Sequence, residues 1–156
     1  MIYMLSTWMI VMTGAAVLGS GAACSGQRRG EAADRLKPCP DSPNCVSSLS
    51  SDPRHRVAPI VHTNSSAGAR ERLLGVIRSM PRARIRSHEG PCLHVEFTSA
   101  VFRFVDDVEF FIDEAEKVIH VRSASRVGYW DLGANRRRVE EIRRMTTRAL
   151  TEATDP

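Results

Sequence analysis

The sequence contains almost no lysine: only Lys37 and Lys117 are lysines among 22 basic residues, although the net charge is +4. Arginine therefore supplies most of the positive charge, and a biased base composition of the coding DNA explains that excess as well as phosphate binding does. No basic run is interleaved with aromatic residues, and no spacing matches a known nucleic-acid-binding motif. The sequence thus argues against a nucleic-acid partner.

The chain also lacks the short motifs that mark hydrolases and metal sites. No serine stands in G-x-S-x-G, and the five histidines are scattered singly rather than paired at i, i+4. One acidic patch has neither the spacing of a calcium loop nor a common face, since neighbouring strand residues point to opposite sides. It comprises Asp106, Asp107, Glu109, Asp113 and Glu114. We therefore predict no catalytic residue, no metal and no cofactor.

Charge is absent from the first 23 residues. This apolar stretch ends in the small residues 19–23, which is typical of a secretory signal because signal peptidase accepts only small side chains at its cleavage site. Cys24 stands where a lipoprotein carries its lipid, although Gly21 occupies the usual place of a leucine. Three interpretations stay open: lipidation of Cys24, cleavage near Ala23, or an uncleaved anchor, for which about 20 apolar residues suffice. The basic residues that follow the segment oppose export by the positive-inside rule.

The remaining cysteines bear on the compartment. Cys39 and Cys45 enclose a loop with two prolines, which buries too little to hold its own shape. A disulfide between them fits an oxidising compartment, whereas a single C-x5-C pair lacks the second ligand pair of a structural zinc site. Cys92, at the start of an apolar strand, is predicted to be a small buried thiol, with Cys39 or Cys45 as its alternative partner.

Periodicity predicts an α+β fold, with an antiparallel sheet of three to four strands packed with two helices over about 67–80 and 135–150. The segment 64–66 caps the first helix and Asn135 the second. Alternation marks strands at 93–97, 107–112 and 119–122, with a weaker one at 82–88. Residues 101–105 are either strand or loop. The predicted boundaries are a signal at 1–23, a linker at 24–37, a single domain at 38–150 that begins with an irregular Pro-rich arm, and a tail at 151–156.

The pairing of the last two strands follows from their apolar residues. Keeping both apolar sets on one face requires Ile112 opposite Ile119, since a slip of one residue would bury His120 and Arg122. This register leaves 114–117 as a four-residue turn and places Glu109 opposite Arg122 on the other face.

Three longer motifs carry a resemblance to a known family. They are CPDSPNCVSS at 39–48, FVDDVEF at 104–110 and RSASRVGYWDLGANRRR at 122–138. By these motifs the chain resembles, over about residues 38–148, the uncharacterised family known as domain of unknown function 1499. Members of that family are typically exported or lipid-anchored bacterial proteins, with plastid relatives. The resemblance implies export here and supplies no substrate, cofactor or catalytic residue.

A cluster of arginines is the strongest candidate for a site. Positive charge at the start of the last helix opposes the helix dipole, so these side chains need acidic partners or an anionic ligand. One interpretation is an ion-pair network that fixes the last helix to the sheet; the other is an anion-binding site. The candidate residues are Asp106, Asp107, Glu109, Arg122, Arg126, Tyr129, Arg136, Arg137 and Arg138.

Together these features favour an exported envelope protein that binds or scaffolds at the membrane surface without catalysis. It would be attached to the membrane through its N-terminal lipid or signal anchor, facing the periplasm or the cell exterior. Its expected partner is an envelope protein or an anionic ligand. The alternative is a small enzyme that acts on an anionic envelope metabolite or lipid head group, with the arginines holding the substrate and Asp106 or Asp107 as the acid or base.

Overall fold

The computed structural model of the protein describes residues 35–152. The predicted signal at 1–23, the candidate lipidation site Cys24 and most of the predicted linker lie outside the described residues. So do residues 153–156 of the predicted tail, whereas Thr151 ends up in the last helix.

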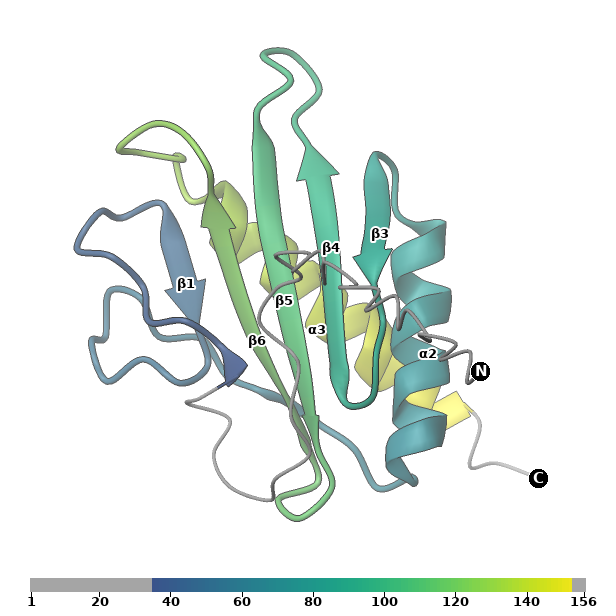
Figure 1. Cartoon of the computed structure of the whole chain (residues 1–156). Helices are drawn as coiled ribbons and strands as arrows, with labels where there is room; N and C mark the ends of the chain where they lie inside the picture. The colour runs from purple at the N-terminus through teal and green to yellow at the C-terminus, as the bar shows by residue number, and fades with distance from the viewer. Residues whose placement is uncertain (1–34, 153–156) are drawn as a thin grey trace, which may run out of the picture.

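Within the described residues, an antiparallel sheet of six strands forms the centre of the fold, confirming the α+β class (Figure 1). The strand order is β1-β6-β5-β4-β3. The strand β2 pairs with the start of β6, on the same edge of β6 as β1. The strands are β1 (Cys45–Ser47), β2 (Ile60–Val61), β3 (Ala83–Ser87), β4 (Cys92–Thr98), β5 (Val105–Asp113) and β6 (Val118–Ser125).

Two helices, α2 (Ser66–Ser79) and α3 (Ala134–Glu152), pack on the same face of this sheet, which we call the inner face. Figure 1 shows α3 running behind the strands. The core between helices and sheet is apolar because strand alternation sends every second side chain inward. Its members include Leu73 and Ile77 of α2, Val139 and Ile142 of α3, and Val95, Phe110 and Val121 of the sheet. No helix of the described chain is both long and apolar enough to span a membrane.

The predicted register of β5 and β6 is confirmed. Ile112 lies opposite Ile119 and Glu109 opposite Arg122, and residues 114–117 form the turn between the strands. The first predicted helix is confirmed as well: Ser65 is its N-cap, and its hydroxyl accepts a hydrogen bond from the amide of Gly68 at 3.2 Å.

The predicted strand number was too low, because the arm is not wholly irregular. The predicted arm, residues 37–59, contributes β1, and β2 follows directly after it; both strands pair with β6. Strands of three and two residues are too short to show alternation, and the pairing is supplied by the free edge of β6 rather than by the arm itself. Of residues 101–105, for which strand and loop were both open, 101–104 lie in the loop between β4 and β5 and Val105 begins β5.

The cysteines divide into a confirmed and a corrected prediction. Cys39 and Cys45 form a disulfide, so the loop between them is closed as expected. Cys92 is buried but is disulfide-bonded rather than the predicted thiol. Neither Cys39 nor Cys45 is its partner, because those two sulfurs bond each other.

The start of α3 differs from the prediction that Asn135 caps it. Asp131 does so instead: its carboxylate accepts hydrogen bonds from the amides of Gly133 and Asn135, at 2.9 and 2.8 Å. Asn135 is fully buried, and its Nδ2 donates at 2.9 Å to the carbonyl of Asn44 and to Ser125 Oγ. One amide side chain thus joins the arm, the sheet and α3.

The strand β3 lies at one edge of the sheet, with β4 as its only strand partner among the described residues. Its pairing with β4 shifts register between Ile85 and Ser87. Arg84 and Arg86 are exposed on this strand.

Candidate functional site

The face of the sheet opposite the helices, which we call the outer face, carries the pair that the register predicts. Arg122 Nη1 lies 3.1 Å from Glu109 Oε2, and both side chains are largely buried. Because the two residues are direct cross-strand neighbours, their ion pair links β5 to β6.

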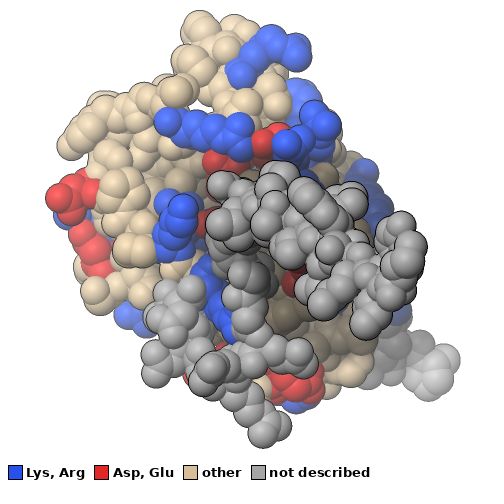
Figure 2. All heavy atoms as spheres, viewed as in Figure 1, with Lys and Arg blue, Asp and Glu red and all other residues tan. Residues whose placement is uncertain are grey.

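Arg126 extends this charged surface toward β4. Its Nε and Nη2 each donate at 2.8 Å to one carboxylate oxygen of Asp107, and Nη2 also donates to Glu96. His94 Nε2 lies 2.7 Å from the same carboxylate of Asp107. A guanidinium that binds two carboxylates in this way is a strong structural tie. Where Figure 2 leaves this face visible, acidic and basic atoms lie side by side.

The pairing shifts the titration of these groups. Partial burial acts to raise the pKa of Asp107, but hydrogen bonds from Arg126 and His94 outweigh it and leave that pKa below its usual value. The hydrogen bond from Arg126 likewise lowers the pKa of Glu96. Hydrogen bonds to Asp107 and Glu96 in turn raise the pKa of Arg126. Neither carboxylate therefore has the raised pKa that a general acid needs at neutral pH.

Asp106 points to the inner face, away from Asp107. Its carboxylate lies 2.6 Å from Nη2 of Arg138 on α3, and both side chains are buried. The guanidinium of Arg138 also stacks over Phe97, 5.0 Å from the ring centroid, and donates to Asn135 at 3.0 Å. This arrangement ties α3 to the sheet, as the ion-network interpretation expects.

The other candidate residues lie elsewhere. Arg136 donates at 2.7 Å to the backbone carbonyls of Arg54 and Arg56 in the arm, and Arg137 donates at 2.7 Å to that of Leu132. Tyr129 is exposed in the loop before α3. The structure therefore distributes the nine candidate residues over the outer face, the inner face, α3 and the loop before it, and does not bring them into one concave site.

Two hollows of the surface lie away from Asp106, Arg122, Arg126 and Tyr129, and among the candidate residues Arg136 and Arg137 line the first. One runs along α3 between arginine and glutamate side chains, from Arg136 to Thr151. The other is formed by the arm, from Leu36 to His55. Neither is lined by Asp106, Arg122, Arg126 or Tyr129.

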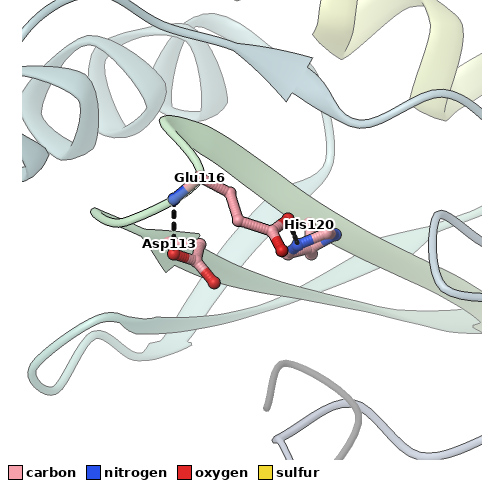
Figure 3. Close-up of side chains that lie close together, drawn as sticks. All are labelled: Asp113, Glu116 and His120. Carbon is pink, nitrogen blue, oxygen red and sulfur yellow. Dashed lines mark hydrogen bonds and ion pairs between the residues drawn. The ribbon is translucent and has the colours of Figure 1, made fainter. Parts of the chain in front are cut away.

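A third group of side chains has the donor set of a metal site. Asp113, Glu116 and His120 place one ligand atom each within 4.8 Å of one another, at the β5–β6 turn (Figure 3). Contacts within the protein account for this arrangement. Asp113 Oδ1 accepts from the amides of Ala115 and Glu116, and His120 lies 3.5 Å from Glu116 and 3.3 Å from Ser48 Oγ. These contacts hold the β5–β6 turn in place, and we assign the three side chains to that structural role.

A feature that sequence reasoning missed is a set of exposed apolar side chains at one end of the sheet. They lie on the β4–β5 loop and the β6–α3 loop, and we call them the apolar end: Val101, Phe102, Phe104, Val127, Tyr129, Trp130 and Leu132. Phe102 and Trp130 are 74% and 71% exposed. Single exposed apolar residues are common on protein surfaces, whereas several large ones at one end of a domain call for an explanation. Apolar residues in these loops have no periodicity that separates exposed from buried positions, so the sequence carried no signal for this feature.

The architecture defines a class of protein: a small α+β domain with an open sheet, a disulfide-closed arm and paired charges on both faces of the sheet. A model of the family described as "Protein of unknown function (DUF1499)" matches residues 35–145. The chain belongs to this family, as the sequence motifs had indicated. A search of curated proteins found no match.

Proposed function

We propose that this chain is an exported envelope protein whose domain binds a component of the membrane surface without catalysing a reaction. The observation that carries the proposal is the apolar end. Seven large apolar side chains on two neighbouring loops remain in contact with water in the isolated domain. Several large exposed apolar side chains on neighbouring loops are typical of an interaction site.

The cysteines support a location outside the cytoplasm. Cys39 and Cys45 are bonded, and Cys92 is bonded as well. Disulfides form and persist in oxidising compartments and are rare in the cytosol. Together with the apolar segment at 1–23, this favours export and attachment at the membrane, facing the periplasm or the cell exterior.

The positions of the charged side chains do not favour the enzymatic alternative. Asp106 and Arg122 lie on opposite faces of the sheet, so they cannot serve one substrate. Asp107 shares a face with Arg126, but the two neutralise each other through two hydrogen bonds. A substrate anion would have to displace that carboxylate before it could use the arginine.

Site-specific photo-cross-linking in bacterial cells tests the proposal. A photoreactive residue replaces Phe102 or Trp130 in the full chain, and we expect cross-links to envelope components from both positions. Val61 provides the matched control, because it is also an exposed apolar residue, at 64%, but lies on β2 next to the other end of β6. Recovery of the protein in the cytosolic fraction, or equal cross-linking from all three positions, would contradict the proposal.

A further inference from the structure

The two loops of the apolar end project from the same end of the sheet. The β4–β5 loop leaves at Thr98 and returns at Val105, which are paired with each other. The β6–α3 loop leaves after Ser125, which is paired with Asp106, the next residue of β5. The two loops are therefore neighbours across β5, and Figure 1 shows both at the upper end of the strands. They form protruding tips rather than a groove.

The side chains on these tips are the types that favour a membrane–water interface. Trp130 and Tyr129 combine an apolar ring with one polar group, which is why such residues concentrate at the level of lipid head groups. Phe102 and Phe104 stack on each other with ring centroids 5.5 Å apart, so they present one apolar wedge. Val101 and Leu132 extend this surface, at 79% and 74% exposure.

The charge on the tips favours an anionic surface. Residues 99–104 include one charged side chain, Arg103, between the two phenylalanines. The one carboxylate of the second loop, Asp131, turns inward to cap α3. Behind the tips, Arg126 holds Asp107 and Glu96 in ion pairs. An approaching lipid head group therefore meets Arg103 without an opposing free carboxylate from either loop.

These observations also separate a lipid surface from a second copy of the chain. Two copies that met through their apolar ends would bring two Arg103 side chains together without a carboxylate from the loops between them. A bilayer that contains anionic lipid offers apolar volume for the rings and negative charge for the arginine at the same depth.

We propose that the apolar end inserts its aromatic side chains into the interface of a bilayer containing anionic lipid, with Arg103 bound to the phosphate layer. The inference rests on the proposed location at the membrane surface and names the lipid itself as the component that is bound. The domain would then lie with its strands pointing toward the bilayer, and the outer face of the sheet would stand roughly perpendicular to it.

Tryptophan fluorescence tests this in the full chain. The sequence has two tryptophans, Trp8 and Trp130, so the Trp8→Phe protein reports on the apolar end alone. We expect vesicles of equimolar phosphatidylcholine and phosphatidylglycerol to shift its emission to the blue, and brominated lipid in those vesicles to quench it. Arg103→Ala should weaken the inserted state about fivefold, the usual effect of one basic residue at an anionic surface. Vesicles of pure phosphatidylcholine, which lack the anionic lipid, should weaken insertion of the unchanged Arg103 protein to a similar extent.

A matched control moves the reporter to the other end of β6. The triple variant Trp8→Phe, Trp130→Phe, Val61→Trp should remain unquenched on the same vesicles, even where the N-terminal segment holds the chain on them. If the chain sediments with the vesicles but Trp130 stays unquenched, the inference is overturned, while the proposed function is unaffected. So would a blue shift without vesicles that grows with protein concentration, since it would identify a second copy as the partner. Cross-links from Phe102 to protein alone would overturn it in favour of a protein partner.

Discussion

The Glu109–Arg122 pair offers the sharpest test of the sheet and of its charged outer face. Only 20% of the Glu109 side chain and 13% of the Arg122 side chain is exposed, and the charged atoms lie 3.1 Å apart. At an effective dielectric constant of about 20, unit charges about 4 Å apart attract by about 4 kcal/mol before desolvation is subtracted. Desolvation is considerable here, because Arg122 Nε is buried without a hydrogen-bond partner in the described structure.

The net coupling should therefore be well below the Coulomb value. We expect Glu109→Ala and Arg122→Ala each to lower the free energy of unfolding by about 2 kcal/mol, since each leaves a half-buried charge unpaired. The double variant should lose less than the sum, with a coupling of about 1 kcal/mol or more. Urea unfolding of the four proteins, followed by circular dichroism, measures all three quantities.

An exposed pair provides the control for this cycle. Arg54 and Asp52 lie 2.7 Å apart, but their side chains are 72% and 35% exposed. Water screens such a pair, so its double-mutant cycle should show no resolvable coupling. If the Glu109 and Arg122 variants were additive within about 0.3 kcal/mol, the reasoning from burial would be refuted.

Three further results are expected. Alkylation before reduction should find Cys92 blocked, because its sulfur is disulfide-bonded; a Cys92 thiol that reacts before reduction would contradict this bond. Asn135→Ala should lower the free energy of unfolding by about 2–4 kcal/mol, because buried partners in the arm and sheet lose their hydrogen bonds; an unchanged urea midpoint would contradict its linking role. Hydrogen bonds from Lys117 and Ser66 lower the pKa of Glu114 from 4.5 to about 2, so its stabilising effect is complete above pH 4.5 and disappears as the pH falls toward 2; Glu114→Gln should remove this part of the acid dependence of the urea midpoint, and an unaltered acid limb would rule it out.

The sequence predicted the elements whose pattern is local and long enough to be read. The β5–β6 register followed from alternation, because a slip of one residue would have placed His120 and Arg122 on the inner face, in the apolar core. The strands of the arm could not be found in this way. Their pairing depends on the edge of β6, which lies about 60 to 80 residues away along the chain.

The candidate site was predicted in composition but not in arrangement. Adjacent residues Asp106 and Asp107 had to face opposite sides of a strand, but which side meets α3 depends on how the helix packs. Asp131 caps α3 instead of Asn135 because the buried side-chain amide of Asn135 is bonded to the arm and to β6. Exposure of Phe102 and Trp130 is a property of the assembled surface, and no pattern within either loop distinguishes an exposed apolar residue from a buried one.

For a domain attached to a membrane among many copies of itself, as we propose for this one, the position of β3 has a consequence. An edge strand offers unpaired amides and carbonyls to any other edge it meets, and two flat edges can join into a continuous sheet. Here the strand is five residues long, changes register partway and carries Arg84 and Arg86 outward. A second β3 brought alongside would meet a bent edge and another Arg84, while Arg86 is already paired with Glu96, so concentration at a surface would not drive the domains to polymerise through this strand.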